Sequence, residues 1–204
     1  GYTAPISTSV NDVVEHGIPD DRPLRSGDVI SIDCGAVVYG WHGDSAITVG
    51  VGELDEPVAA LVAACERSLT AGIAAMVGHG RLGDIGAAVQ ASVEESGSYG
   101  ILTDFTGHGI GRAMHEDPFV PNYRTRRRGP RLEVGVGLAI EPMITLGDPD
   151  VSVDADGWTV RTDDGTVSAH VEHTVAITPA GPWVLTAMDG PSTWEEASDS
   201  HGAA

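Results

Sequence analysis

The chain has 204 residues, of which 41% are hydrophobic, and a formal net charge of −19. All eleven basic residues are arginine, so most of the surface should repel nucleic acid, which argues against DNA as a partner. A chain of this length can bury a core that needs no disulfide, and Cys34 and Cys65 show no metal-type spacing. No apolar run is long enough to cross a membrane and no signal peptide precedes the first motif, so we expect a cytoplasmic protein with reduced cysteines. We also expect a monomer.

The predicted elements are strands, then helices, then strands again. Short β-rich segments cover 6–10, 29–34 and 46–49, with Gly40 in a hairpin between the last two. Apolar residues then recur at helical spacing over 55–77, and a second helix is predicted over 84–95, with Gly97 after its end. Strands return at 138–146, 158–161 and 169–177. Because strands and helices are grouped rather than alternating, the pattern favours an α+β fold over a doubly wound sheet.

Two segments depart from this pattern. Residues 189–204 are acidic and rich in small residues, so a disordered tail is predicted there and the folded domain is predicted to span 1–188. A basic cluster interrupts the acidic chain. It either forms a solvated surface loop or offers a local contact for RNA or an acidic partner. The arginine cluster consists of Arg124, Arg126, Arg127, Arg128 and Arg131.

Several familiar motifs are excluded. Residues 78–83 match G-x-G-x-x-G, but a nucleotide-binding loop must follow a strand, and this segment follows a predicted helix. The chain has no Walker loop, no H-E-x-x-H and no G-x-S-x-G elbow. The usual signatures of P-loop enzymes, thermolysin-like proteases and serine hydrolases are therefore absent.

Three acids, Asp33, Glu141 and Glu172, interrupt apolar strands. A buried carboxylate is costly unless a positive group meets it, and the chain has no lysine. One such acid alone could be a hydrogen-bonded structural residue, but several converging carboxylates would repel one another. Divalent cations solve this problem, and carboxylates with an imidazole suit Mn, Fe, Co or Zn. Four carboxylates and one histidine are enough to hold a pair of ions.

Five segments, in this order, resemble the signature segments of the methionine aminopeptidase family: "SVNDVVEHGIPDD", "GWHGDS", "GHGIGRAMHEDP", "AIEPMI" and "VEHTVAIT". The match runs from Gly1 to about Thr186, and the absence of a long insertion between the halves makes type I the closer branch. The resemblance implies the pita-bread α+β fold, an antiparallel sheet with outer helices in two pseudo-symmetric halves. It also implies removal of the initiator methionine from the N-termini of nascent polypeptides.

The resemblance further implies two divalent metal ions, Co, Mn, Fe or Zn. Asp44 and Glu172 would bridge them, Asp33 would chelate one, and His108 with Glu141 would hold the other. A water activated by the cations would be the nucleophile, and Glu141 would act as the general base. The implied metal ligands are Asp33, Asp44, His108, Glu141 and Glu172.

Two further histidines match catalytic positions of the family. His115 would stabilise the developing oxyanion, and His16 would contact the backbone nitrogen of the substrate. Isolated histidines are often only hydrogen-bonded core residues, and it is the "HGIP" context of His16 that favours a role. His42 and His173 are expected to orient Asp44 and Glu172.

Four residues match positions that line or cover the methionine pocket in relatives. They are Tyr2, Ser7, Met114 and Trp158. For Met114 and Trp158, plain packing explains an apolar side chain equally well. Ser7 stands where relatives often have cysteine, which bears on fine selectivity.

Other interpretations stay open at this point. An aminopeptidase P or prolidase-like enzyme would share the metal ligands but cleave bonds to proline. A metal-free binding module could share the fold without catalysis. The arginine cluster could contact ribosomal RNA near emerging chains. Relatives also carry a leading helical segment before Gly1, so we expect this chain to be less stable and less active than a front-extended version.

Overall fold

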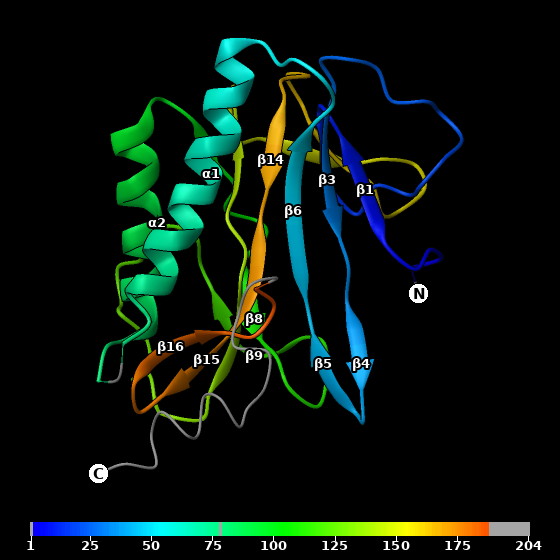
Figure 1. Cartoon of the computed structure of the whole chain (residues 1–204). Coiled ribbons are helices and arrows are strands. Elements are labelled where there is room, and N and C mark those ends of the chain that lie inside the picture. The colour runs from blue at the N-terminus through cyan, green and yellow to red at the C-terminus, as the bar shows by residue number, and fades with distance from the viewer. Residues whose placement is uncertain (1, 78, 188–204) are drawn as a thin grey trace.

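The structure is a computed structural model that describes residues 2–77 and 79–187 (Figure 1). The strands that precede the helices are β1 (Ser7–Val10), β2 (Val13–Glu15), β3 (Val29–Asp33), β4 (Ala36–Val38), β5 (Trp41–Gly43) and β6 (Ser45–Gly50). The helices are α1 (Glu56–Ala74) and α2 (Leu82–Ser96). The strands that follow are β7 (Gly100–Ile101), β8 (Gly107–Gly109), β9 (Glu116–Val120), β10 (Gly137–Ile140), β11 (Met143–Thr145), β12 (Val151–Val153), β13 (Val160–Thr162), β14 (Ser168–His170), β15 (Glu172–Thr178) and β16 (Gly181–Val184).

The main sheet is antiparallel and has two related halves. Its strand order is β1-β3-β6-β15-β10-β8-β9, and β16 also pairs with β15. The pair β6–β15 lies at the centre, so that β3 corresponds to β10 and β1 corresponds to β8 on either side. This arrangement joins the beginning and the end of the chain, because Glu172 pairs with Ala46 and His173 with Ser45.

Smaller sheets flank the main one, and they account for two breaks in the predicted strands. The chain leaves the main sheet after β10 and enters a three-stranded sheet, β14-β11-β7, while β12-β13-β2 and the hairpin β4–β5 form two more. The strand predicted over 138–146 is therefore two strands separated by Glu141 and Pro142. The strand predicted over 169–177 is likewise broken at Val171.

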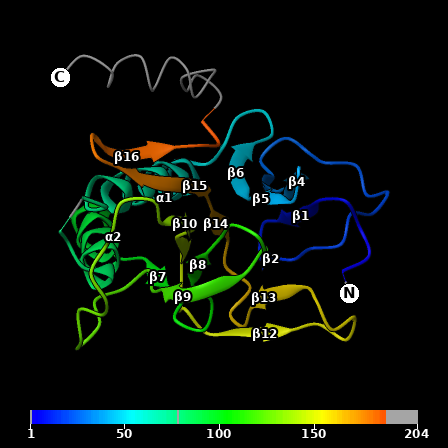
Figure 2. The same cartoon turned by 90° about the horizontal axis from the view of Figure 1, so that it is seen from below.

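Both helices lie side by side on one side of the sheets, as Figures 1 and 2 show. Leu61, Cys65 and Leu69 of α1 are buried in the main core, as are Ile85 and Val93 of α2. Their spacing is that of the inward stripe of an amphipathic helix. The predictions of two helices and of an α+β fold are confirmed.

By length and composition alone, α1 is long and apolar enough to cross a membrane, although none was expected from the sequence. One such helix is weak evidence, because a helix that covers a core passes the same test. Here α1 packs against β14, β11 and β10.

Two features predicted from the sequence concern turns. Gly40, with φ +77°, lies between β4 and β5, where the left-handed backbone region favours glycine. Within the rejected G-x-G-x-x-G motif, residues 79–81 lie between the two helices, and Leu82 and Gly83 begin α2. The element that precedes the motif is α1 and not a strand. The predicted tail, 189–204, lies outside the described residues.

Candidate metal centre

The two halves of the sheet bring four acids to one place. Asp33 ends β3 and Glu141 directly follows β10, which occupy corresponding positions in the two halves. Asp44 directly precedes β6 and Glu172 begins β15, the two strands that pair at the centre. The pairing of Asp33 with Ala46 places the first acid beside the start of β6. The sheet register therefore gathers side chains that lie far apart in sequence.

Three of the predicted ligands form a compact cluster. Asp44, His108 and Glu172 each offer one ligand atom, and these atoms all lie within 4.8 Å of one another. Glu141 joins them through His108, with 3.3 Å between Glu141 Oε1 and His108 Nε2. His108 Nδ1 lies 2.9 Å from the carbonyl oxygen of Gly109 and must be the donor there, because a carbonyl only accepts. In the neutral His108 ring, the lone pair of Nε2 therefore faces the negatively charged Glu141 carboxylate. The two groups repel each other unless a proton or a cation lies between them.

Burial and mutual repulsion favour the neutral forms of these carboxyls. Burial raises the pKa of Asp33 to about 7, opposed by His170 and reinforced by Asp44 and Glu141. Burial and then Asp44 raise the pKa of Glu141 well above its usual range. Burial and then Glu141 likewise raise the pKa of Glu172. Each shift records an uncompensated negative charge in the core.

These residues fit divalent cations. Asp33 Oδ1 and Glu172 Oε1 are buried and have no hydrogen-bond partner among the described residues. Such orphaned oxygens are rare in proteins and call for a partner. Carboxylate oxygens with one imidazole nitrogen are a donor set for Mn, Fe, Co or Zn, and the added positive charge would restore the ionised carboxylates.

His115 lies on the open side of the cluster. The ring centroids of His108 and His115 are 4.4 Å apart, yet His108 is buried and His115 is exposed. A cavity of about 390 Å³ is lined by both rings and by Phe119. One histidine can thus serve the cluster while the other faces a bound substrate.

The chain itself can now be placed among known proteins. The model of metallopeptidase family M24 matches residues 1–179. Methionine aminopeptidase 1 of Mycobacterium tuberculosis is 53% identical over 192 residues, which cover 91% of this chain and 72% of that protein. The chain belongs to the methionine aminopeptidases of metallopeptidase family M24.

Solved structures agree with this assignment. Methionine aminopeptidase from Thermotoga maritima superposes with a TM-score of 0.86 at 44% identity, over 89% of this chain and 73% of that one. A prolidase from Pyrococcus furiosus shares 20% identity with a TM-score of 0.70, over 91% of this chain and 50% of its own. That second likeness concerns the fold alone. The pita-bread fold expected from the resemblance is confirmed.

In this family member, three aromatic rings enclose the predicted substrate side. The rings of Tyr2 and Trp158 meet edge to face at 5.4 Å, and His16 lies 6.3 Å from Trp158. The Tyr2 hydroxyl donates to the carbonyl oxygen of Gly17 at 2.8 Å, which ties the start of the chain to the turn after His16. Ser7 is buried and pairs with Asp33 across β1 and β3.

Met114 lies beside Gly35, next to Asp44. A Cβ added to Gly35 would collide with the Met114 methyl group and lie 3.4 Å from Asp44 Oδ1. A side chain at position 35 would therefore require the flexible end of Met114 to move. The turn that carries Met114 is held by the β4–β5 hairpin. The amide of His42 donates to the carbonyl oxygen of Gly111 at 2.8 Å, and the Arg112 guanidinium stacks 3.8 Å from the Trp41 ring centroid.

His42 and His173, which were expected to orient Asp44 and Glu172, make other contacts in the structure. His173 Nδ1 lies 2.8 Å from the hydroxyl of Thr186, on the face of β15 opposite to Glu172. The backbone of Asp44 is held by Thr174, whose hydroxyl donates to the Asp44 carbonyl oxygen at 2.8 Å. For His42 the described contact is the backbone bond to Gly111.

Sequence reasoning missed two buried ionisable groups, Glu15 and His170. His170 Nε2 lies 3.7 Å from Glu141 Oε2, and His170 is two residues before Glu172 on the extended chain. Glu15 ends the buried strand β2. Both residues carried a signal, since each is a polar residue in an apolar strand, the same signal that identified Asp33. Asn122, also missed, donates to the Glu141 carbonyl oxygen at 2.9 Å.

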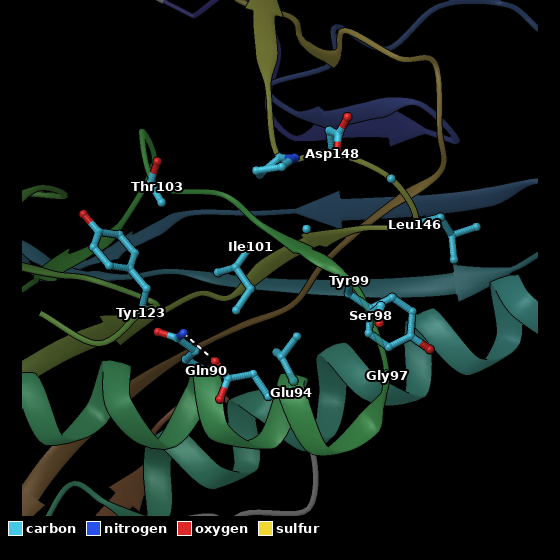
Figure 3. A pocket seen from close by; sticks show the side chains of 14 residues that line it. Gln90, Glu94, Gly97, Ser98, Tyr99, Ile101, Thr103, Tyr123, Leu146 and Asp148 are labelled. Atoms are coloured by element: carbon cyan, nitrogen blue, oxygen red, sulfur yellow. Dashed lines mark hydrogen bonds between the residues drawn. The ribbon is translucent and has the colours of Figure 1, made fainter.

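A larger hollow of about 930 Å³ lies elsewhere, between the end of α2, β7 and the segment after β11 (Figure 3). Its lining includes Tyr99, Ile101 and Tyr123, and Gln90 hydrogen-bonds Glu94 at its edge. None of the predicted site residues lines this hollow, so it is separate from the candidate metal centre.

Proposed function

We propose that this protein removes the N-terminal methionine from polypeptides by metal-dependent hydrolysis. One observation carries the proposal: Asp44, His108 and Glu172 converge within 4.8 Å, with Glu141 3.3 Å from His108, in a chain 53% identical to a methionine aminopeptidase. The substrates proposed are newly made polypeptides that begin with methionine, and the cytoplasm is the compartment proposed.

The residues proposed to hold two divalent cations are Asp33, Asp44, His108, Glu141 and Glu172. When bound, such cations lower the pKa of a water and polarise the scissile carbonyl. Glu141 is the proposed proton acceptor, because its carboxylate lies within 3.3 Å of His108 in a site where charge is poorly solvated. His115, which is exposed beside His108, is proposed to donate to the developing oxyanion.

The substrate's own N-terminus is proposed to enter between the aromatic rings. His16, Tyr2 and Trp158 lie within ring-contact distance of one another, and Met114 lies beside Gly35 next to Asp44. Thioether and aromatic side chains adapt to an unbranched apolar group and give a charged one no partner. His16 is proposed to contact the backbone nitrogen at the bond to be cleaved.

The test is hydrolysis of Met-Ala-Ser by the purified chain, first with EDTA and then with added Mn or Co. We expect release of free methionine only with metal, and a loss of at least about 100-fold in Glu141→Ala. Glu95→Ala, an exposed acid at the end of α2, is the matched control and should keep full activity.

The same assay distinguishes the alternatives. Cleavage of an Xaa-Pro peptide in place of Met-Ala-Ser would replace the proposal with a proline-specific activity. A chain that binds no metal, measured by equilibrium dialysis and elemental analysis, would favour a binding module.

We also propose a ribosome contact by the arginine cluster. Two of its members are engaged within the chain, since Arg128 bonds both oxygens of Asp84 at 2.8 and 2.6 Å and Arg124 lies 3.7 Å from Glu94. Arg126 and Arg127 are exposed and available to phosphates. Arg126→Glu with Arg127→Glu should abolish co-sedimentation with ribosomes at low salt. Unaltered co-sedimentation would remove this contact.

A further inference from the structure

Glu15 is a buried carboxylate for which the proposed reaction has no role. Its residue is 4% exposed, and Oε1 has no hydrogen-bond partner among the described residues. Glu141 and Glu172, which are buried to a similar degree, belong to the proposed ligand set. Leaving a carboxylate unpaired in the core costs stability, so its presence needs a reason.

The nearest group that Glu15 can serve is the adjacent histidine. Glu15 Oε1 lies 3.6 Å from His16 Nδ1, just beyond hydrogen-bond length, and a small rotation would close the contact. Catalytic hydrogen bonds are often long before substrate binds. The metal cluster is a poorer candidate, because Glu141 lies 3.3 Å from His108, whereas among the described residues the ion-pair contact of Glu15 is with His16.

His16 is held in an unusual backbone conformation. Its φ is +54°, a left-handed value that residues with a side chain rarely adopt, and the turn after it is anchored by Tyr2 and Ser9. Such strain persists where the surroundings impose it, and it is concentrated at functional sites. The backbone thus fixes the position of the His16 Cβ atom. The orientation and the tautomer of the ring depend on a side-chain partner.

We propose that Glu15 is the positioning residue for His16. An oxygen of its carboxyl group accepts a hydrogen bond from Nδ1 of the ring, which fixes the tautomer and presents Nε2 to the backbone nitrogen of the substrate. A carboxylate that orients a histidine in this way is a recurrent arrangement in enzymes. The inference rests on the proposed function, because it assigns a partner to a substrate-contacting residue of that same site.

The decisive variant is Glu15→Leu, which removes the acceptor but keeps a similar side-chain volume. We expect kcat for Met-Ala-Ser to fall about 10- to 100-fold with little change in KM or in Mn affinity. The melting temperature should stay level or rise, because an unpaired buried carboxylate has been replaced by an apolar group. Glu15→Gln keeps an acceptor oxygen and should recover part of the activity, which a purely structural role would not require.

A double-mutant cycle tests whether Glu15 acts through His16. In a His16→Ala background, Glu15→Leu should change kcat by less than about twofold. Full additivity of the two losses would overturn the proposal, as would a loss of Mn affinity in Glu15→Leu equal to its loss of kcat.

A measurement without turnover separates this inference from the proposed function. Nitrogen-15 NMR of the histidine rings, with His16 assigned by its absence in His16→Ala, should report a proton on Nδ1 in the wild type. In Glu15→Leu that preference should disappear. If the wild type fails to cleave Met-Ala-Ser yet shows this Glu15-dependent tautomer, the proposed function fails and the positioning contact stands. An unchanged tautomer overturns the contact whatever the activity.

Discussion

At the scale of single residues, the main feature of this protein is a set of polar side chains buried among apolar ones. Glu15 shows the effect most simply, because it is buried and its Oε1 has no hydrogen-bond partner among the described residues. Burial raises the pKa of Glu15 to about 8, opposed by His170 and reinforced by Glu141 and Asp33. The folded chain therefore binds a proton that the unfolded chain would release.

The sign of this shift predicts how stability depends on pH in the metal-free protein. Below the ordinary pKa of 4.5, Glu15 is protonated in both states and costs nothing. As pH rises from 4.5 to about 8, only the unfolded chain gains by releasing the proton, so the free energy of unfolding falls across this window. The melting temperature in EDTA should therefore decline from pH 5 to pH 8, and more gently in Glu15→Gln. Parallel profiles for both proteins would contradict the assigned shift.

Residue type alone predicted much of the candidate site. An acid inside an apolar strand identified Asp33, Glu141 and Glu172, and the structure brings Glu172 together with Asp44 and His108. The same criterion applied to Glu15 and His170 would have found them. Their proximity to Glu141 depends on the pairing of distant strands, which residue type does not encode.

At the scale of elements, the sequence predicted both helices and the longer strands but not their interruptions. Periodicity predicted one strand over 138–146, whereas β10 ends at Ile140 and β11 starts at Met143. Pro142 has no amide hydrogen to donate to a ladder, and the chain changes sheets there. Strands of two or three residues, such as β7 and β2, are too short for an alternation pattern to reveal.

The contact between α2 and the chain after β9 offers a test of packing. Gly86 is buried, and a Cβ added there would collide with the carbonyl oxygen of Pro121 and lie 2.5 Å from that of Tyr123. Backbone atoms cannot move aside as a flexible side chain can. Gly86→Ala should therefore destabilise by about 1–3 kcal/mol, although alanine is the better helix former. Urea unfolding of the metal-free protein measures the difference.

Gly43→Ala is the matched control for that experiment, for stability only. A Cβ at Gly43 would meet no atom within 4 Å, and its backbone is not left-handed. Gly43→Ala should change the urea midpoint of unfolding little. If Gly86→Ala were as stable as Gly43→Ala, the close approach of α2 would not constrain the fold.

At the scale of the whole molecule, the pseudo-symmetric sheet makes the metal centre a junction between the two ends of the chain. Asp33 and Asp44 come from the first half, and His108, Glu141 and Glu172 from the second. The halves meet along β6 and β15, whose described register is short, Glu172 with Ala46 and His173 with Ser45. This organisation followed from the resemblance and not from periodicity, because only strand order shows which segments correspond.

Cations at this junction should therefore stabilise the whole fold and not only the site. A ligand that binds the native state at about 100 times its Kd adds about 2.7 kcal/mol. For a chain of this size, that gain corresponds to roughly 5–10 °C in melting temperature. We expect Mn added to EDTA-treated protein at pH 7.5 to raise the melting temperature by this amount in a single transition.

Asp44→Asn should abolish most of the shift, because Asp44 belongs to the compact cluster. Asp104→Asn, the same change at an exposed residue, should keep the full shift. Two separate transitions, or an equal shift in both variants, would mean that the metal does not join the halves.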